Sequence, residues 1–189
     1  MLKQNSIKRI YIGNTNNKLE ELCKEYNIEL IPFINGIYEI ENAKLTAKGI
    51  IHYLGNDELD ISDYKVLVVG YGNIAYYLCE ILDVYEVEYS VLTLNPLENK
   101  YLRLNKKNIK NELNAVGFNL IINTIPYNLD WDYSTFKDSK IIDVASKPYG
   151  FDIDKIIENK IDYYILSAIP SRYCPYTAAK LLKNTLNFY

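Results

Sequence analysis

The feature that most constrains the fold is a regular alternation of apolar and amphipathic segments that begins at Lys65. Five short runs are apolar almost throughout, as strands buried on both faces of a sheet are. They comprise residues 65–69, 89–94, 120–123, 140–144 and 162–166. Helices are expected at residues 74–82, 106–115, 131–136, 154–159 and 175–189. Strands that alternate with helices predict an α/β protein with a doubly wound parallel sheet.

A glycine turn joins the first of these strands to the next helix, in the stretch VLVVGYGNIAYYL. In the dinucleotide fingerprint G-x-G-x-x-G/A, one glycine makes the tight turn, the second lets backbone approach the pyrophosphate, and the third small residue packs the helix on the sheet. Gly70, Gly72 and Ala75 occupy these positions. The turn therefore predicts a Rossmann-like sheet that holds a dinucleotide. Its expected cofactor-binding residues are Gly70, Tyr71, Gly72, Asn73 and Ile74.

The ends of the following strands supply further candidates, because ligands of open α/β sheets bind beyond the carboxyl ends of the strands. Asn95 follows the second strand, where an acidic residue would bind the ribose 2′-hydroxyl of NAD and a basic one the 2′-phosphate of NADP. Because Asn95 is neither acidic nor basic, the sequence does not decide between NAD and NADP. Asn123 ends the third strand, Thr124 and Pro126 follow it, and all three are expected near the nicotinamide or its ribose.

Polar groups that could bind a substrate follow the last two strands. Ser146 and Lys147 come after one strand, and Arg172 precedes the last helix. A small dicarboxylate would suit Lys147 and Arg172, because a guanidinium can bind a carboxylate through two hydrogen bonds. The alternative is that both are solvated surface charges. The single histidine, His52, is expected at a helix surface or interface.

The composition indicates which binding partners and which cellular location to expect for the protein. The net charge is −3 and the basic residues are dispersed, so nucleic acid is not expected. No apolar run approaches the length of about 20 residues that a membrane-spanning helix needs. The first ten residues lack the apolar core of a signal peptide, which predicts a cytoplasmic protein. Three widely spaced cysteines predict neither a disulfide framework nor a metal site.

A smaller β-α-β unit precedes the alternating region. A strand is expected at residues 7–13, a helix at 17–27, a second strand at 28–33 and a connecting helix at 42–56. The predicted division places residues 1–56 in this part and residues 57–189 in the Rossmann-like domain with its C-terminal helix.

Several phrases of the chain, taken in order, resemble dipicolinate synthase, and specifically the A component of that enzyme. They are NAKLTAKGIIHYL, KVLVVGYGNIAYYL, LIINTIPYNL, KIIDVASKPYGFD and ILSAIPSRYCPYTAAKLL. The first β-α-β unit resembles the last portion of that family's N-terminal domain, most of which this sequence does not contain. The resemblance therefore implies that residues 1–56 are a truncated remnant of a substrate-side domain.

The resemblance also implies an activity. Members of that family are cytoplasmic oxidoreductase subunits of spore-forming bacteria that work with a flavoprotein B subunit during sporulation. They oxidise a cyclic dihydrodipicolinate precursor to pyridine-2,6-dicarboxylate with a nicotinamide cofactor, usually NADP. The partners implied by the resemblance are a small dicarboxylate substrate and the flavoprotein B subunit. Separately, the apolar last helix, residues 176–189, is a candidate contact for a homodimer.

The sequence departs from the family pattern in its glycine turn and after the second strand. The family turn resembles G-F-G-R-T-G, whereas this one has Asn73 in place of the basic residue and Ala75 in place of the last glycine. Asn95 replaces another basic residue. These changes favour an alternative, a shortened non-catalytic relative that holds a binding or regulatory partner on its Rossmann surface. A small unrelated Rossmann dehydrogenase is a third reading, and no residue is assigned a catalytic role.

Overall fold

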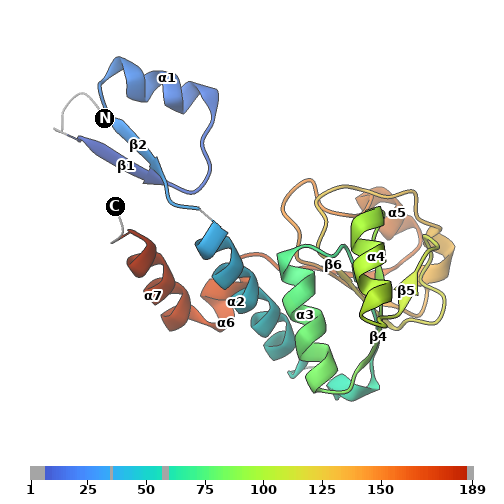
Figure 1. Ribbon diagram of the computed structural model, residues 1–189. Helices are drawn as coiled ribbons and strands as arrows, with labels where there is room; N and C mark the ends of the chain where they lie inside the picture. The colour runs from blue at the N-terminus through green and yellow to red at the C-terminus, as the bar shows by residue number, and fades with distance from the viewer. Residues whose placement is uncertain (1–6, 35, 57–59, 187–189) are drawn as a thin grey trace.

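The structure is a computed structural model that describes residues 7–34, 36–56 and 60–186. It contains a two-stranded parallel sheet near the N-terminus and a six-stranded parallel sheet (Figure 1). The smaller sheet pairs β1 (Arg9–Ile12) with β2 (Glu29–Pro32), and α1 (Asn17–Glu25) connects the two strands. The predicted α/β class, with a doubly wound parallel sheet preceded by a β-α-β segment, is confirmed.

The large sheet has the strand order β5-β4-β3-β6-β7-β8. Its strands are β3 (Lys65–Val69), β4 (Glu88–Leu92), β5 (Ile109–Lys110), β6 (Leu120–Asn123), β7 (Lys140–Asp143) and β8 (Asp162–Ile165). The connecting and terminal helices are α2 (Gly36–Leu54), α3 (Asn73–Val84), α4 (Pro96–Leu104), α5 (Ile153–Glu158), α6 (Ile169–Tyr173) and α7 (Pro175–Leu186). The chain order reverses at β3, which lies between β4 and β6. This switch point is where ligands bind in such sheets.

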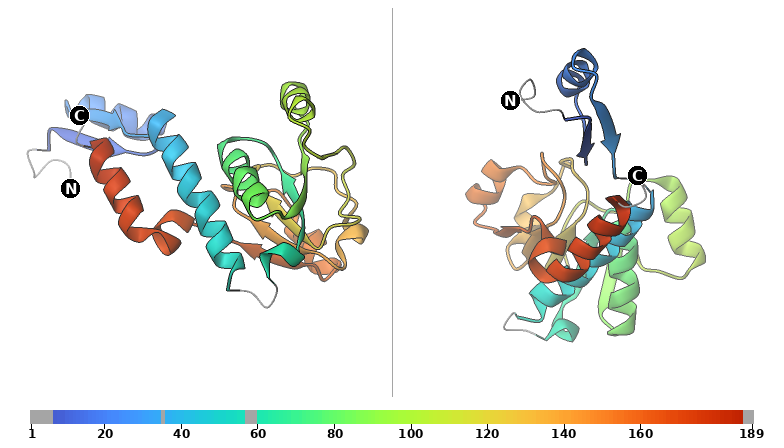
Figure 2. Two further views of the ribbon diagram at one scale, coloured as in Figure 1. Left: turned by 60° about the horizontal axis from the view of Figure 1, so that its bottom comes forward. Right: turned by 90° about the vertical axis from the view of Figure 1, so that its left-hand side faces the viewer.

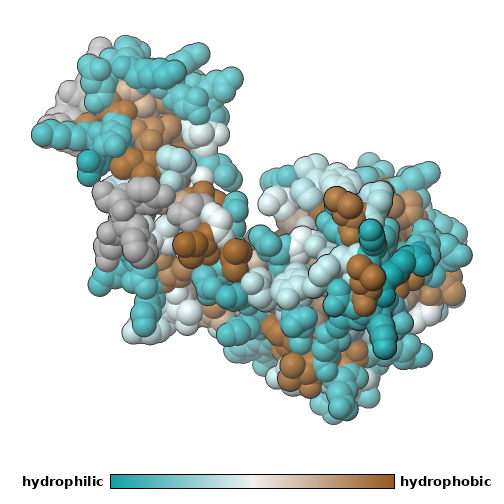
Figure 3. Space-filling view, in the orientation of Figure 1, coloured by the Kyte–Doolittle hydropathy of each residue, from teal (hydrophilic) through white to brown (hydrophobic). Residues whose placement is uncertain are grey.

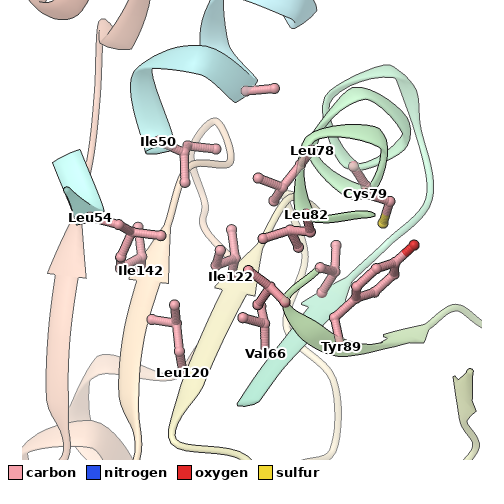
Figure 4. Packing of buried hydrophobic residues seen from close by; sticks show 14 of the residues in the cluster. Ile50, Leu54, Val66, Leu78, Cys79, Leu82, Tyr89, Leu120, Ile122 and Ile142 are labelled. Atoms are coloured by element: carbon pink, nitrogen blue, oxygen red, sulfur yellow. The ribbon is translucent and has the colours of Figure 1, made fainter. Parts of the chain in front are cut away.

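Two apolar cores cover the two faces of the large sheet, because successive strand side chains point to opposite faces. Val66 faces the core that contains Leu78 of α3 and Ile50 of α2 (Figure 4). Val68 belongs to the same core. The intervening Leu67 faces the second core, which contains a cluster of aromatic rings among aliphatic side chains. Those rings belong to Trp131, Tyr133, Phe136 and Phe151. Helix α2 is therefore part of the core of the large sheet, although it precedes residue 57.

The β1-α1-β2 unit stands apart from the large sheet, at the end of α2 where that helix begins (Figures 1 and 2). Its connection to the rest of the chain includes Phe33, whose ring centroid lies 5.5 Å from that of Tyr38 on α2. Its own buried residues are few and include Cys23, Ile28 and Ile31. Hydrophobic side chains reach the surface of this unit (Figure 3). Helix α7 packs beside α2 on the same side of the molecule (Figure 2).

One predicted helix is wrong. Residues 106–115 form no helix; the connection instead contains α4 at Pro96–Leu104, followed by the short strand β5 at Ile109–Lys110. The physical reason lies at Asn95, whose side-chain Oδ1 accepts a hydrogen bond from the Leu97 N–H at 2.9 Å and caps the helix. Pro96 then supplies a first-turn residue with a preset φ. The helix thus begins shortly after β4 ends.

Other boundaries differ by a few residues. Helix α2 begins at Gly36 rather than residue 42, and residues 133–136 form a 3-10 turn that Asp132 caps. The five-residue helix α6 was not predicted. The residues expected at 187–189 of the last helix lie outside the described part of the chain.

Candidate functional site

The glycine turn lies between the end of β3 at Val69 and the start of α3 at Asn73. Gly70 has φ +91°, a conformation that favours glycine. A Cβ atom added at Gly70 would lie 2.6 Å from Ile125 Cγ2 and 2.6 Å from Thr124 Oγ1. The fold itself therefore requires glycine at this position.

Gly72 differs from Gly70 because the protein's own packing does not require it. Its φ is −74°, and a Cβ added there would have none of the described atoms beyond its chain neighbours within 4 Å. The open space lies before the N-terminus of α3, whose first turn, Asn73 to Tyr76, is uncharged. Helix N-termini attract anions, and in the fingerprint this glycine lets the pyrophosphate approach the backbone. The turn thus fits a dinucleotide.

The other residues of the fingerprint segment, Ala75 and Tyr71, pack against the protein itself. Ala75 is fully buried between α3 and the sheet, as the third position of the fingerprint should be. Tyr71 packs its ring against Tyr76 and Tyr101, with centroid distances of 6.2 and 6.1 Å. Burial raises the pKa of Tyr71 well above its ordinary value, in keeping with a ring that packs against its neighbours.

A cavity of about 170 Å³ opens at the glycine turn. The turn, the end of β4, the first turn of α4 and the loop after β6 form its walls. The lining residues are Gly70, Tyr71, Gly72, Leu92, Thr93, Leu94, Asn95, Glu98, Ile125, Tyr127 and Leu129. The cavity therefore lies at the switch point of the sheet, and it contains the predicted Gly70, Tyr71, Gly72 and Asn95.

Glu98 is a lining residue that the sequence reasoning missed. It belongs to the first turn of α4, where Thr93 donates a hydrogen bond to its Oε2 and Asn95 Nδ2 donates to its Oε1 at 3.3 Å. The spacing Asn95-x-x-Glu98 is that of a capping box, in which a cap residue precedes Glu by three positions. This signal could have located both the start of α4 and the carboxylate.

Asn123 and Asp143 form a fully buried pair at the ends of β6 and β7. Asn123 Nδ2 donates to Asp143 Oδ1 and to the Ile125 carbonyl, each at 2.9 Å. The second Asp143 oxygen accepts hydrogen bonds from the Gly150 N–H at 2.9 Å and the Tyr163 hydroxyl at 3.0 Å. Asn123 thus already uses its amide donors inside the protein, and the pair fixes the loops that follow both strands.

Thr124 and Pro126 lie in the loop after β6. The Thr124 hydroxyl donates to the Val69 carbonyl at 2.8 Å and thereby ties this loop to the glycine turn. Pro126 is exposed, and its neighbours Ile125 and Tyr127 line the cavity instead. Thr124 therefore acts on the site through the position of the turn.

A larger cleft of about 630 Å³ lies between α2, α7 and the ends of β7 and β8. Ile74, the second residue of α3, also lines this cleft. Its polar lining includes the hydroxyls of Ser146, Ser167 and Ser171, and among the described residues no charged side chain lines it. Of the predicted substrate residues, Ser146 lies in the cleft, whereas Lys147 and Arg172 are exposed outside its lining.

Three further features were considered in the sequence: a metal site, a membrane-spanning helix and the position of His52. In the part of the chain that the structure describes, no group of three or more His, Cys, Asp or Glu residues could hold a metal ion. None of the described helices is both long and apolar enough to span a bilayer. His52 is exposed on α2, with its ring 5.4 Å from that of Tyr173, which confirms the predicted helix-surface position.

The strand order and the glycine turn define a Rossmann-like α/β fold. No family model and no curated protein sequence matches the chain. Its fold matches the A component of dipicolinate synthase from Bacillus halodurans, with a TM-score of 0.79 and 21% identity over 94% of this chain and 64% of that one. It also matches the corresponding component of dipicolinate synthase from Bacillus subtilis, with a TM-score of 0.81 and 22% identity over 94% of this chain and 63% of that one.

The chain therefore spans less than two thirds of the length of either dipicolinate synthase structure. A protein called CAD from Helicobacter pylori, solved in complex with NADP(H), is also similar, with a TM-score of 0.50 and 15% identity over 66% of this chain and 38% of that one. These likenesses confirm the resemblance to dipicolinate synthase at the level of the fold.

Proposed function

We propose that this chain is a nicotinamide-dinucleotide-binding oxidoreductase subunit of the dipicolinate synthase A type. The observation that carries the proposal is the open space at Gly72, in front of the α3 N-terminus and at the switch point of the sheet. Glycine at that position has no packing role in the described structure, whereas a bound pyrophosphate would require it. The structural likeness to the two dipicolinate synthase structures supports the same reading.

The proposed reaction is oxidation of a cyclic dihydrodipicolinate precursor to pyridine-2,6-dicarboxylate during sporulation. A bound nicotinamide would accept the hydride, so the protein would need to bind and orient the reactants rather than supply a nucleophile. In this proposal the substrate occupies the larger cleft, where the hydroxyls of Ser146 and Ser167 can donate hydrogen bonds to carboxylates. The partners that the proposal includes are a second copy of the chain and a flavoprotein B subunit.

Titration of the purified chain with NADH and NADPH, followed by nucleotide fluorescence, tests the proposal. We expect saturable binding of at least one nucleotide, and a loss of affinity of about tenfold or more in Gly72→Val, because the added side chain fills the space for the pyrophosphate. Gly36→Val is the matched control, since a Cβ at Gly36 also has open space around it but lies at the start of α2. If neither nucleotide binds at millimolar concentration, the proposal is wrong.

One observation favours a second candidate, a non-catalytic binding relative. The described lining of the larger cleft offers hydroxyl and amide groups but no carboxylate, ammonium or imidazole that could transfer a proton. Such a relative would bind nucleotide or a protein partner without turnover. Incubation with the oxidised nucleotide and the dihydrodipicolinate precursor distinguishes the two, because only the oxidoreductase forms reduced nucleotide.

A further inference from the structure

We propose that Glu98 makes this site select NAD over NADP. This assignment rests on the proposed dinucleotide binding and concerns the part of the site that would face the adenosine ribose. In Rossmann-like sheets that ribose lies beyond the end of the second strand of the unit, which is β4 here. Glu98 lines the cavity at this end together with Gly70 and Gly72.

The neighbouring groups hold the Glu98 carboxylate in place. Thr93, the first residue after β4, donates its hydroxyl to Oε2 and accepts the Asn95 N–H at 3.1 Å. Asn95 Nδ2 donates to Oε1 at 3.3 Å, and Asn99 Nδ2 donates to the Thr93 carbonyl at 3.0 Å. A carboxylate has about four acceptor positions, so acceptor capacity remains for the hydroxyls of a ribose. Glu98 is therefore preorganised as a hydrogen-bond acceptor.

The charges at this end of the cavity disfavour a phosphate. Of the described residues that line the cavity, Glu98 is the charged one, and neither Lys nor Arg contributes to the lining. Lys100 and Arg103 follow on α4, but both side chains are exposed outside the lining. The N-terminus of α4 would otherwise attract an anion, and Glu98 in its first turn already complements that dipole.

The two cofactors differ at the atom that Glu98 would meet. The 2′-hydroxyl of NAD can donate a hydrogen bond to the carboxylate, whereas the 2′-phosphate of NADP carries a charge of about −1.5 to −2 near neutral pH and offers acceptors. A phosphate beside a fixed carboxylate suffers like-charge repulsion with no cation to offset it. The geometry therefore opposes the NADP preference that resemblance alone implies.

Competing titrations of NADH and NADPH into the full chain test the assignment. We expect the unmodified chain to bind NADH about tenfold or more tightly than NADPH, and Glu98→Gln to lose most of that preference because NADPH binds better. The amide can still accept from Thr93, and thermal unfolding checks that α4 keeps its stability. Glu88→Gln, at the opposite end of β4, removes the same charge and should leave the preference unchanged.

The outcomes separate this assignment from the proposal on which it rests. Equal or tighter binding of NADPH by the unmodified chain overturns the role of Glu98 while dinucleotide binding stands. An NADH preference that persists in Glu98→Gln, or that falls equally in Glu88→Gln, overturns it too. If neither nucleotide binds, dinucleotide binding itself fails and the assignment falls with it.

Discussion

At the scale of single residues, the two glycines of the turn have different physical origins. Gly70 is required by the chain itself, since its φ is positive and a Cβ would meet Thr124 and Ile125. Gly72 has open space around it, so its substitution by alanine would cause no clash within the described structure. Gly72 is therefore the more informative of the two, because its replacement can disrupt ligand binding without destabilising the fold.

Gly150 provides a residue-scale prediction about the buried Asn123–Asp143 pair. A Cβ added at Gly150 would lie 2.2 Å from Asn123 Nδ2, and the Gly150 N–H donates to Asp143. We expect Gly150→Ala to lower the free energy of unfolding by about 1–3 kcal/mol, as overpacking in a core does. Urea denaturation measures the change. Gly36→Ala should leave the transition nearly unchanged, and an equal loss in both variants would contradict the prediction.

Two tyrosines, the buried Tyr89 and the partly buried Tyr163, predict how stability changes in alkali. Burial, followed by the negative charge of Asp143, raises the pKa of Tyr163, and burial is also the main cause of the raised pKa of Tyr89. The folded chain thus keeps phenolic protons that the unfolded chain releases near pH 10, so the native state binds more protons there. The stabilising contribution is complete below about pH 10 and decreases as the pH rises above that value.

Urea midpoints at about pH 8 and about pH 10.5 measure this effect. The midpoint should fall on going to the higher pH, and Tyr163→Phe should show a smaller fall, although it loses the hydrogen bond to Asp143 and is less stable at the lower pH. If the chain and the variant lose stability equally between the two pH values, Tyr163 does not contribute to the alkaline transition.

At the scale of elements, five strands of the large sheet could be predicted because each is a largely apolar run, whereas β5 lies within residues that were expected to form a helix. The strands expected at 65–69 and 120–123 coincide with β3 and β6. Helix α4, PLENKYLRL, was missed; charged and amide residues interrupt its apolar ones, and Leu102 is its one fully buried side chain. Its start is determined by the cap at Asn95 rather than by hydrophobic periodicity. The capping residue therefore marks where α4 begins, which the hydrophobic pattern did not.

In the site, too, features that are local in sequence could be predicted, whereas contacts between distant residues could not. Gly70, Gly72 and Ala75 could be recognised because the fingerprint is local in sequence. Glu98 was missed because the helix after β4 was expected at the wrong residues, although the Asn95-x-x-Glu98 spacing marks its position. Asn123 was expected to face a ligand, and only the pairing of β6 with β7 shows that its amide is committed to Asp143. Contacts between strands that are distant in sequence decide which polar groups remain available.

At the scale of the whole molecule, the chain consists of one large core and one small unit with little burial of its own. Helix α2 belongs to the large core, where Ile50 and Leu54 are fully buried against the sheet and α3 (Figure 4). A two-stranded sheet with one helix gains little from burial, and sheets this small are marginally stable in isolation. The β1-α1-β2 unit should therefore be less stable than the rest of the chain. The boundary between the two parts should lie before α2, so that α2 unfolds with the large sheet.

A pair of matched variants tests this boundary. Ile50→Ala should lower the free energy of unfolding of the main transition by about 2–5 kcal/mol, because it opens a cavity in the core of the large sheet. Ile31→Ala, on β2 of the small unit, removes the same atoms from a residue that is 9% exposed and should leave the main transition within about 0.5 kcal/mol of the unmodified chain. Hydrogen exchange of the β1, α1 and β2 amides should instead become faster in Ile31→Ala. If Ile31→Ala destabilises the main transition as much as Ile50→Ala does, the small unit and the large sheet unfold as one cooperative unit and the boundary is wrong.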